Sequence, residues 1–170
     1  DYKTKGRADT PNKNGYYTAA NVDFGEAKLV YEFLDMVNEA RAAEGHAPVT
    51  WTNLDSMEEY TLLRAQELTV VHSHERPGYS EANPGEKYNF LDEIIAGNDS
   101  ANSAQITKVF EAWMKSSGHR QCIMDDVYTS MCAARIKNHW IITFNTKGGE
   151  GLLEGGTLVN YERHNGWLTD

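Results

Sequence analysis

The sequence predicts an α+β protein in which helices pack on a mostly antiparallel sheet. Three stretches carry apolar residues at helical spacing, and two β-type runs follow them at residues 131–136 and 140–145. Helices and strands do not alternate along the chain, as they would in a parallel α/β fold. At 170 residues, the chain has the length of a single domain.

Charge and hydropathy exclude several classes of function. The net charge is -9 at pH 7, whereas nucleic acids and anionic membrane surfaces attract basic proteins. We therefore expect no nucleic-acid partner. No apolar run approaches the length that spans a bilayer, so we expect a protein that is not transmembrane.

The N-terminal part divides into an arm and a first helix. Residues 1–25 are polar and lack periodicity, and we interpret them as an extended arm or linker. Residues 26–44 are predicted to be helical because Leu29, Phe33 and Val37 share one apolar stripe. Gly45 is expected to end this helix.

The second predicted helix covers residues 53–70. Its apolar stripe includes Leu54, Met57 and Leu68 at helical spacing. The charged positions of the same helix are predicted to face solvent: Glu58, Glu59, Arg64 and Glu67.

A third helix and a hairpin complete the predicted domain, which extends over residues 26–145. Helical spacing runs through residues 103–116, and Gly118 is expected to end that helix in a turn. Trp113 and Phe110 on this helix are interpreted as core residues. Residues 137–139 connect the two β-type runs as a hairpin. Residues 146–170 form a C-terminal extension, with a further strand expected around 157–161.

The spacing of polar residues leaves the chemistry open. A metal or polar site could draw on His74, with His72 beside it, and on Glu93 and His119, but the spacing is not diagnostic and each histidine could equally be a surface or capping group. A nucleophilic site near His119 lacks the Gly-x-Ser-x-Gly elbow.

Several motifs, taken in order, resemble those of a known family. Residues 37–45 read VNEARAAEG, residues 73–77 read Ser-His-Glu-Arg-Pro, and residues 113–120 read WMKSSGHR. Their order resembles the CAP superfamily, or SCP-like domain, which groups cysteine-rich secretory proteins, antigen 5 and pathogenesis-related 1 proteins. The bacterial branch is the closer likeness. The resemblance covers about residues 29–144 and implies a three-layer α/β/α sandwich.

The resemblance also implies a site. Many members place two histidines and two acidic residues in a central cleft, and some bind zinc there. The histidines correspond to His74 and His119, which we expect to be the metal ligands. The glutamate is assigned to Glu93 rather than Glu86, because apolar residues and a glycine follow it. Ser116 occupies the second acidic position, so the expected cleft consists of His74, Glu93, Ser116 and His119.

With one carboxylate instead of two, this cleft carries less negative charge toward a cation. The resemblance therefore implies zinc or another divalent metal bound weakly, and least of all at low pH, where a protonated imidazole is no ligand. Cys122 and Cys132 also depart from the bacterial motifs, which usually hold Asn and Gly at these positions. Two departures in one small region lead us to predict a Cys122–Cys132 disulfide, which fits an extracellular protein.

The resemblance implies a secreted protein, extracellular or at the cell surface, whose cleft binds a ligand, a metal or a partner without catalysis. Lipid or sterol binding and contacts with other proteins are roles of different branches. A protease-like hydrolase that uses His74, Glu93, Ser116 and His119 is the alternative. A structural cell-surface module, dependent on the two ends of the chain, is the third possibility.

Overall fold

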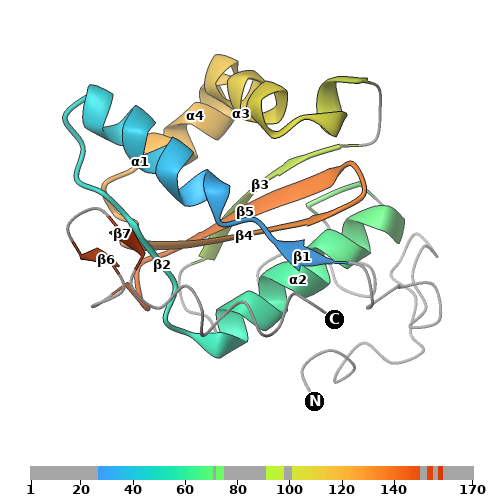
Figure 1. Ribbon diagram of the computed structural model, residues 1–170, viewed down its shortest axis with the longest axis horizontal. Helices are drawn as coiled ribbons and strands as arrows, with labels where there is room; N and C mark the ends of the chain where they lie inside the picture. The colour runs from blue at the N-terminus through green and yellow to red at the C-terminus, as the bar shows by residue number, and fades with distance from the viewer. Residues whose placement is uncertain are drawn as a thin grey trace.

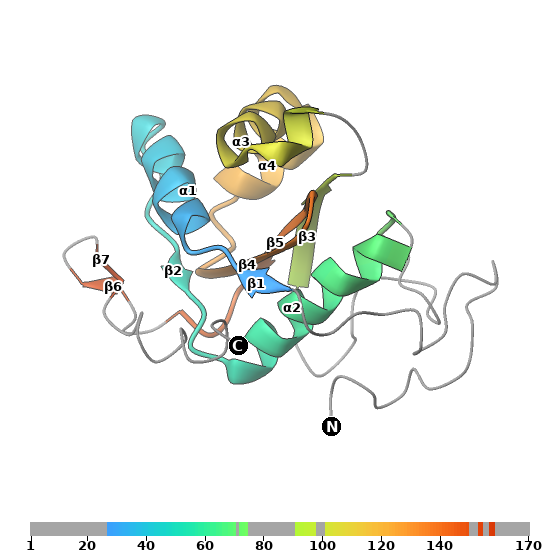
Figure 2. The ribbon, with the colours of Figure 1, turned by 45° about the vertical axis from the view of Figure 1, so that its right-hand side comes forward.

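The computed structural model describes residues 27–70, 72–74, 91–97 and 101–149, with the backbone of 153–154 and 157–158. The predicted arm at residues 1–25 lies outside this part of the chain. The described elements form three layers, as the two views show (Figure 1; Figure 2). One face of the sheet is covered by α2 (Asp55–Val70), and the other by α1 (Glu32–Ala43), α3 (Ile106–Lys115) and α4 (Ser117–Met124). The predicted α/β/α sandwich is confirmed.

The hairpin of β4 (Ser130–Ile136) and β5 (His139–Asn145) is the centre of the sheet and matches the two predicted β-type runs. The strand order is β1-β4-β5-β3, with antiparallel neighbours, and β1 (Lys28–Leu29) and β3 (Leu91–Ala96) lie at the ends. A short strand, β2 (Thr50–Trp51), pairs with β4 in parallel. In the tail, β7 (Thr157–Leu158) pairs with β6 (Leu153–Glu154), in a separate two-stranded sheet.

The register of the hairpin decides which helices each side chain meets, because alternate residues of a strand point to opposite faces. The Thr143 hydroxyl of β5 lies 2.8 Å from the Thr61 hydroxyl of α2, so this row faces α2. Trp140, three residues earlier on β5, faces the other layer. Its ring centroid lies 5.8 Å from that of Phe33 on α1.

The first helix is shorter than predicted but ends as predicted. Residues 28–29 form the strand β1, and α1 begins only at Glu32. At the other end, Gly45 has a φ of +80°, a conformation that glycine adopts without strain. The amides of Gly45 and His46 donate to the carbonyls of Ala42 and Arg41, which is the pattern of a Schellman motif.

The predicted turn after the third helix is itself a helix. Trp113 on α3 is 1% exposed and therefore belongs to the core, as expected. Ser116 then has an extended conformation, and α4 starts at the next residue. Gly118 lies inside α4, so the prediction that it ends a helix is wrong. The chain thus changes direction at Ser116 and supplies a second helix that carries His119.

Three of the four charged residues of α2 predicted to face solvent are buried, which corrects the prediction for them, whereas Glu59 is half-buried. Glu58, Arg64 and Glu67 are each 0% exposed. Buried charges require partners. Glu58 accepts a hydrogen bond of 2.8 Å from the indole of Trp51, and Arg64 contacts Glu67 at 3.1 Å.

Candidate functional site

Glu93 lies at the centre of a buried ionic cluster. It is 8% exposed, on the strand β3 and on the face that α2 covers. Arg64 donates from Nε to Oε1 at 2.9 Å and from Nη2 to Oε2 at 2.8 Å. Burial by itself would raise the pKa of Glu93, but the charge and hydrogen bonds of Arg64, with a contribution from His74, lower that pKa to about 2. Glu93 is therefore ionised at any ordinary pH.

Arg64 connects three segments that are distant in sequence. Besides Glu93, its guanidinium donates to Glu67 on the same helix and to the backbone carbonyl of Ser73 at 2.8 Å. Burial lowers the pKa of Arg64, and the two carboxylates raise it by more, so the guanidinium stays charged. Arg64 was not among the predicted site residues. The only signal for it in the sequence is the spacing of three residues to Glu67.

His74 contacts the carboxylate of Glu93 from outside this cluster. Its Nδ1 lies 3.0 Å from Oε2 of Glu93, and its side chain is 59% exposed. The hydrogen bond to Glu93 raises the pKa of His74, and burial offsets part of this rise. Because an ionised carboxylate only accepts, Nδ1 carries the proton and the neutral ring keeps its lone pair on Nε2. The geometry therefore leaves Nε2 as the donor atom for a ligand.

His119 on α4 lies near enough to His74 for the two charges to interact. Burial lowers the pKa of His119, and the positive charge of His74 lowers it further. The contact of His74 with Glu93 and the electrostatic effect of His74 on His119 are what link the three predicted residues. We call these three residues the cleft triad. It combines two imidazoles with a carboxylate that is already held by an arginine.

Ser116 and His72, which the sequence also suggested for the site, make no described contact with the cleft triad. Within the described residues, no hydrogen bond joins the Ser116 side chain to the cleft triad, and its backbone carbonyl accepts from the amide of Arg120 at 2.8 Å. His72 has its ring centroid 5.9 Å from that of His139 on β5. The described part of the chain also contains no group of three or more His, Cys, Asp or Glu side chains arranged to hold a metal ion.

The predicted Cys122–Cys132 disulfide is not formed, because both thiols are free. Cys132 is buried on β4, where its partner in the register is Thr143, so it faces α2. Cys122 lies on α4, in the layer on the opposite face of the sheet. The sheet therefore separates two cysteines that are ten positions apart in sequence.

Cys122 takes part in a polar contact instead. Its Sγ donates to Oδ2 of Asp92 at 3.2 Å, and the Tyr128 hydroxyl donates to the same oxygen at 3.1 Å. Burial and the carboxylate raise the pKa of Cys122 to about 12. A thiol that stays protonated is a poor nucleophile. This arrangement does not favour a Cys–His active site with the neighbouring His119.

Comparisons with solved structures identify proteins of similar fold. An extracellular protein with an SCP domain from Bacillus anthracis matches with a TM-score of 0.57 and 15% identity, over 68% of this chain and 39% of that one. A cysteine-rich secretory protein from Staphylococcus aureus matches with a TM-score of 0.54 and 16% identity, over 68% of this chain and 37% of that one. An outer surface protein from Borrelia burgdorferi matches with a TM-score of 0.53 and 17% identity, over 71% of this chain and 98% of that one. This chain thus spans less than half the length of the first two.

The family assignment rests on a match to a family model. No curated protein matches the chain in sequence. In the described residues, no helix is both long and apolar enough to span a membrane. The family model of the cysteine-rich secretory proteins matches residues 34–140, which is more than half of the chain. With the layered fold of the bacterial SCP domains, this match shows that the chain belongs to the cysteine-rich secretory protein (CAP) family.

Proposed function

We propose that this chain is a secreted CAP module that binds a divalent transition metal such as zinc through imidazole nitrogens of His74 and His119. The observation that carries the proposal is the 3.0 Å contact between Nδ1 of His74 and a carboxylate of Glu93. Metal-bound histidines commonly donate their other ring N–H to a carboxylate, which fixes the ring and its tautomer. In this arrangement Glu93 orients a ligand and is not itself one.

The donor set fits a weakly held metal. Arg64 occupies both oxygens of Glu93, so the protein would supply two imidazole nitrogens, and water or a ligand would complete the coordination. Protons compete with the metal for Nε2 of His74, whose pKa is raised. The pKa of His119 is lowered, so as the pH rises His119 loses its proton before His74 does. We therefore expect affinity to increase as the pH rises above the ordinary pKa of His74 and to be limited by that residue.

Zinc titration by calorimetry at pH 7.5 and pH 6.0 tests this proposal. The wild-type chain should give saturable heat at the higher pH and less at the lower one, and the His74→Ala/His119→Ala double variant should give none. His46→Ala is the matched control, since His46 pairs with Asp126 and takes no part in the cleft triad. Glu93→Gln should reduce the affinity by about 10–100-fold. Absence of heat at pH 7.5, or unchanged heat in the double variant, would overturn the proposal.

A binding role accords better with the site than a hydrolytic one. A serine nucleophile needs a hydrogen-bonded base, and the described contacts do not connect Ser116 with His119. Extracellular and outer-surface descriptions of the structural relatives support secretion for this chain. Turnover of peptide or ester substrates that disappears in His119→Ala, in a protein that keeps its fold, would instead favour the hydrolase.

A further inference from the structure

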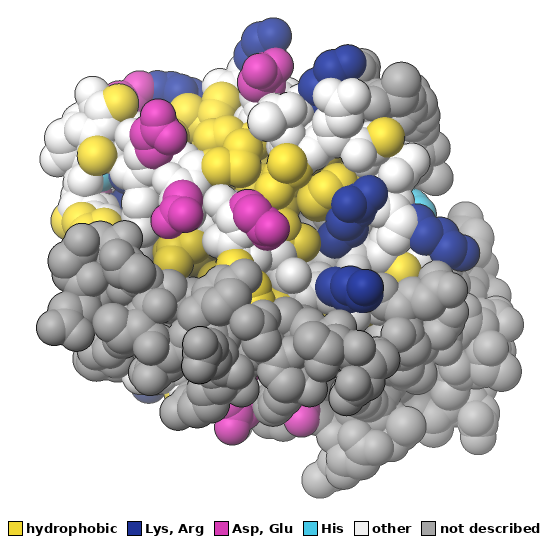
Figure 3. Space-filling model, viewed as in Figure 1, with side chains coloured by type: hydrophobic (Ala, Val, Ile, Leu, Met, Phe, Trp, Pro, Cys, Tyr) yellow, Lys and Arg dark blue, Asp and Glu magenta, His cyan; other side chains and the backbone are white. Residues whose placement is uncertain are grey.

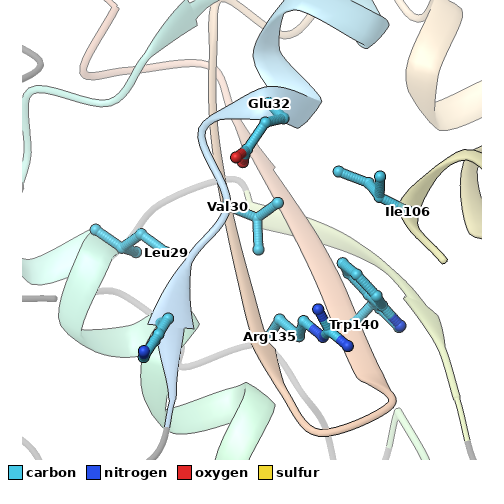
Figure 4. Close-up of a pocket in the computed structure, with 7 residues that line it drawn as sticks. Leu29, Val30, Glu32, Ile106, Arg135 and Trp140 are labelled. Atoms are coloured by element: carbon cyan, nitrogen blue, oxygen red, sulfur yellow. The ribbon is translucent and has the colours of Figure 1, made fainter. Parts of the chain in front are cut away.

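A hollow of about 280 Å³ lies on the face of the sheet opposite to the cluster of Glu93. It is bounded by β1, the start of α1, the start of α3 and the β4–β5 hairpin, as Figure 4 shows. None of its lining residues belongs to the cleft triad. Ligand pockets usually measure roughly 300–1,000 Å³, so this hollow lies just below that range and has room only for a small molecule.

Two basic residues from neighbouring strands line this hollow. Lys28 on β1 and Arg135 on β4 are directly opposed partners in the antiparallel register. Like charges in this position repel each other. Within the described residues, no carboxylate lies within ion-pair distance of either cation, although the chain has a net charge of -9. The pair would be relieved by an anion that both cations contact.

Arg135 is held in a fixed orientation. Its guanidinium carbon lies 4.2 Å from the centroid of the Trp140 ring, and its Nε donates to the carbonyl of Lys137 at 2.6 Å. Trp140 is itself 2% exposed, and its indole donates to the carbonyl of Ser103 at 2.6 Å. The Nη atoms of Arg135 are therefore presented by a rigid support, which lowers the entropy lost on binding.

The remaining lining is apolar, with one acidic group at the far end. Val30 and Ile106 stand on either side of the hollow above Trp140, and Glu32 lies at the end near α1 (Figure 4). In the view of Figure 3, a band of hydrophobic side chains has acidic side chains along its left and basic side chains along its right. The lining has two positive charges, on Lys28 and Arg135, and one negative charge, on Glu32. The lining of the hollow therefore has a net positive charge.

We propose that this hollow binds a small organic carboxylate with an aromatic or branched apolar body. The carboxylate lies between Lys28 and Arg135, and planar guanidinium groups match its geometry. The body packs along Val30, Ile106 and Trp140. This site is independent of metal binding by the cleft triad.

Calorimetry with 3-phenylpropionate and 4-methylpentanoate, each against its uncharged alcohol, tests the charge requirement. The two carboxylates should bind saturably, and the two alcohols should bind at least about tenfold more weakly, because each lacks the charge-assisted hydrogen bonds. Inorganic phosphate, titrated alone, should not bind comparably, since it has no apolar body.

Three charge variants and one control locate the site. Arg135→Gln and Lys28→Gln should each weaken binding of 3-phenylpropionate, whereas Glu32→Gln should strengthen it by removing a repulsive charge. Lys115→Gln, at the far end of α3, removes the same charge as Lys28→Gln and should change nothing. The indole N–H resonance of Trp140, identified by Trp140→Phe, should shift on titration in wild type. The His74→Ala/His119→Ala variant should bind like wild type.

Equal binding of the carboxylates and the alcohols would overturn the proposal, because the hollow would then be only an apolar crevice. Equal weakening by Lys115→Gln, or comparable binding of inorganic phosphate, would also contradict it. Thermal unfolding of each variant shows whether it keeps its fold. Since Lys28 is exposed, Lys28→Gln remains informative even if Arg135→Gln does not fold.

Discussion

The carboxylate of Glu93 receives donors from two directions, a guanidinium from α2 and an imidazole from the segment that follows it. Removing its charge would leave Arg64 buried without its bidentate partner. Loss of one member of a buried ion pair is costly, whereas loss of an exposed charge is not. At the residue scale, therefore, this cluster has a role in stability besides its role in orienting His74.

We predict that Glu93→Gln lowers the free energy of unfolding by about 3–5 kcal/mol at pH 7. The pKa of Glu93 is about 2 in the fold and 4.5 in the reference state, so its charge stabilises the fold above pH 4.5. This contribution is lost as the pH falls from 4.5 toward 2. Urea unfolding between pH 7 and pH 3 should show the difference between wild type and variant narrowing with acid. Glu39→Gln, exposed on α1, is the control and should stay near wild type.

At the scale of elements, Arg41 joins α1 to the end of α4. It is 2% exposed, and its Nη1 donates to the carbonyls of Ile123 and Asp125 at 2.8 and 3.0 Å. Its Nε donates to the carbonyl of Ala47 at 2.7 Å. These carbonyls belong to a helix end and a loop, where the backbone otherwise lacks partners. The position of α4, and with it that of His119, depends on this contact.

Arg41→Lys should therefore destabilise the fold by about 2 kcal/mol or more, because an ammonium cannot replace the fork of donors. The matched control is Arg120→Lys. Arg120 on α4 forms a half-exposed ion pair with Glu44, the residue that follows α1. This control substitution should cost less than about 1 kcal/mol. Urea unfolding of both variants measures the difference. Equal effects would show that Arg41 is no more than a surface contact.

At the scale of the whole molecule, the sheet divides the chain into two chemically distinct faces. Cys132, Thr143 and Glu93 occupy the face toward α2, in one row across three strands. Asp92 and Cys122 occupy the other. Since alternation along a strand is strict, residues that are neighbours in sequence, such as Asp92 and Glu93, serve different layers.

This division predicts two free thiols in the folded chain. A thiol reagent should label two cysteines per chain after denaturation without reductant, and reductant should leave the free energy of unfolding unchanged. Native Cys132, which is 0% exposed, should react only on unfolding. The Cys122→Ser/Cys132→Ser variant, which cannot form the bond, is the control for labelling. One disulfide in the purified chain would contradict the described fold.

The sequence by itself determined the elements whose side chains follow a simple period or a family motif. The stripe of α1, the glycine at its end and the β4–β5 hairpin follow from local spacing, and the motifs around His74 and His119 indicated the CAP fold. Local preferences are encoded within a few residues of each position, so they can be recognised without knowing what packs against them.

Tertiary structure alone decided the chemistry between distant segments. Glu58, Arg64 and Glu67 resemble a solvated helix face until their partners are known, because burial of a charge depends on contacts that the helix itself does not provide. The same holds for the Cys122–Cys132 pair, which sequence proximity joins and the sheet separates. Pairing across strands likewise placed Lys28 opposite Arg135, although they are 107 positions apart in sequence. Such contacts depend on register and layer, which only the assembled fold defines.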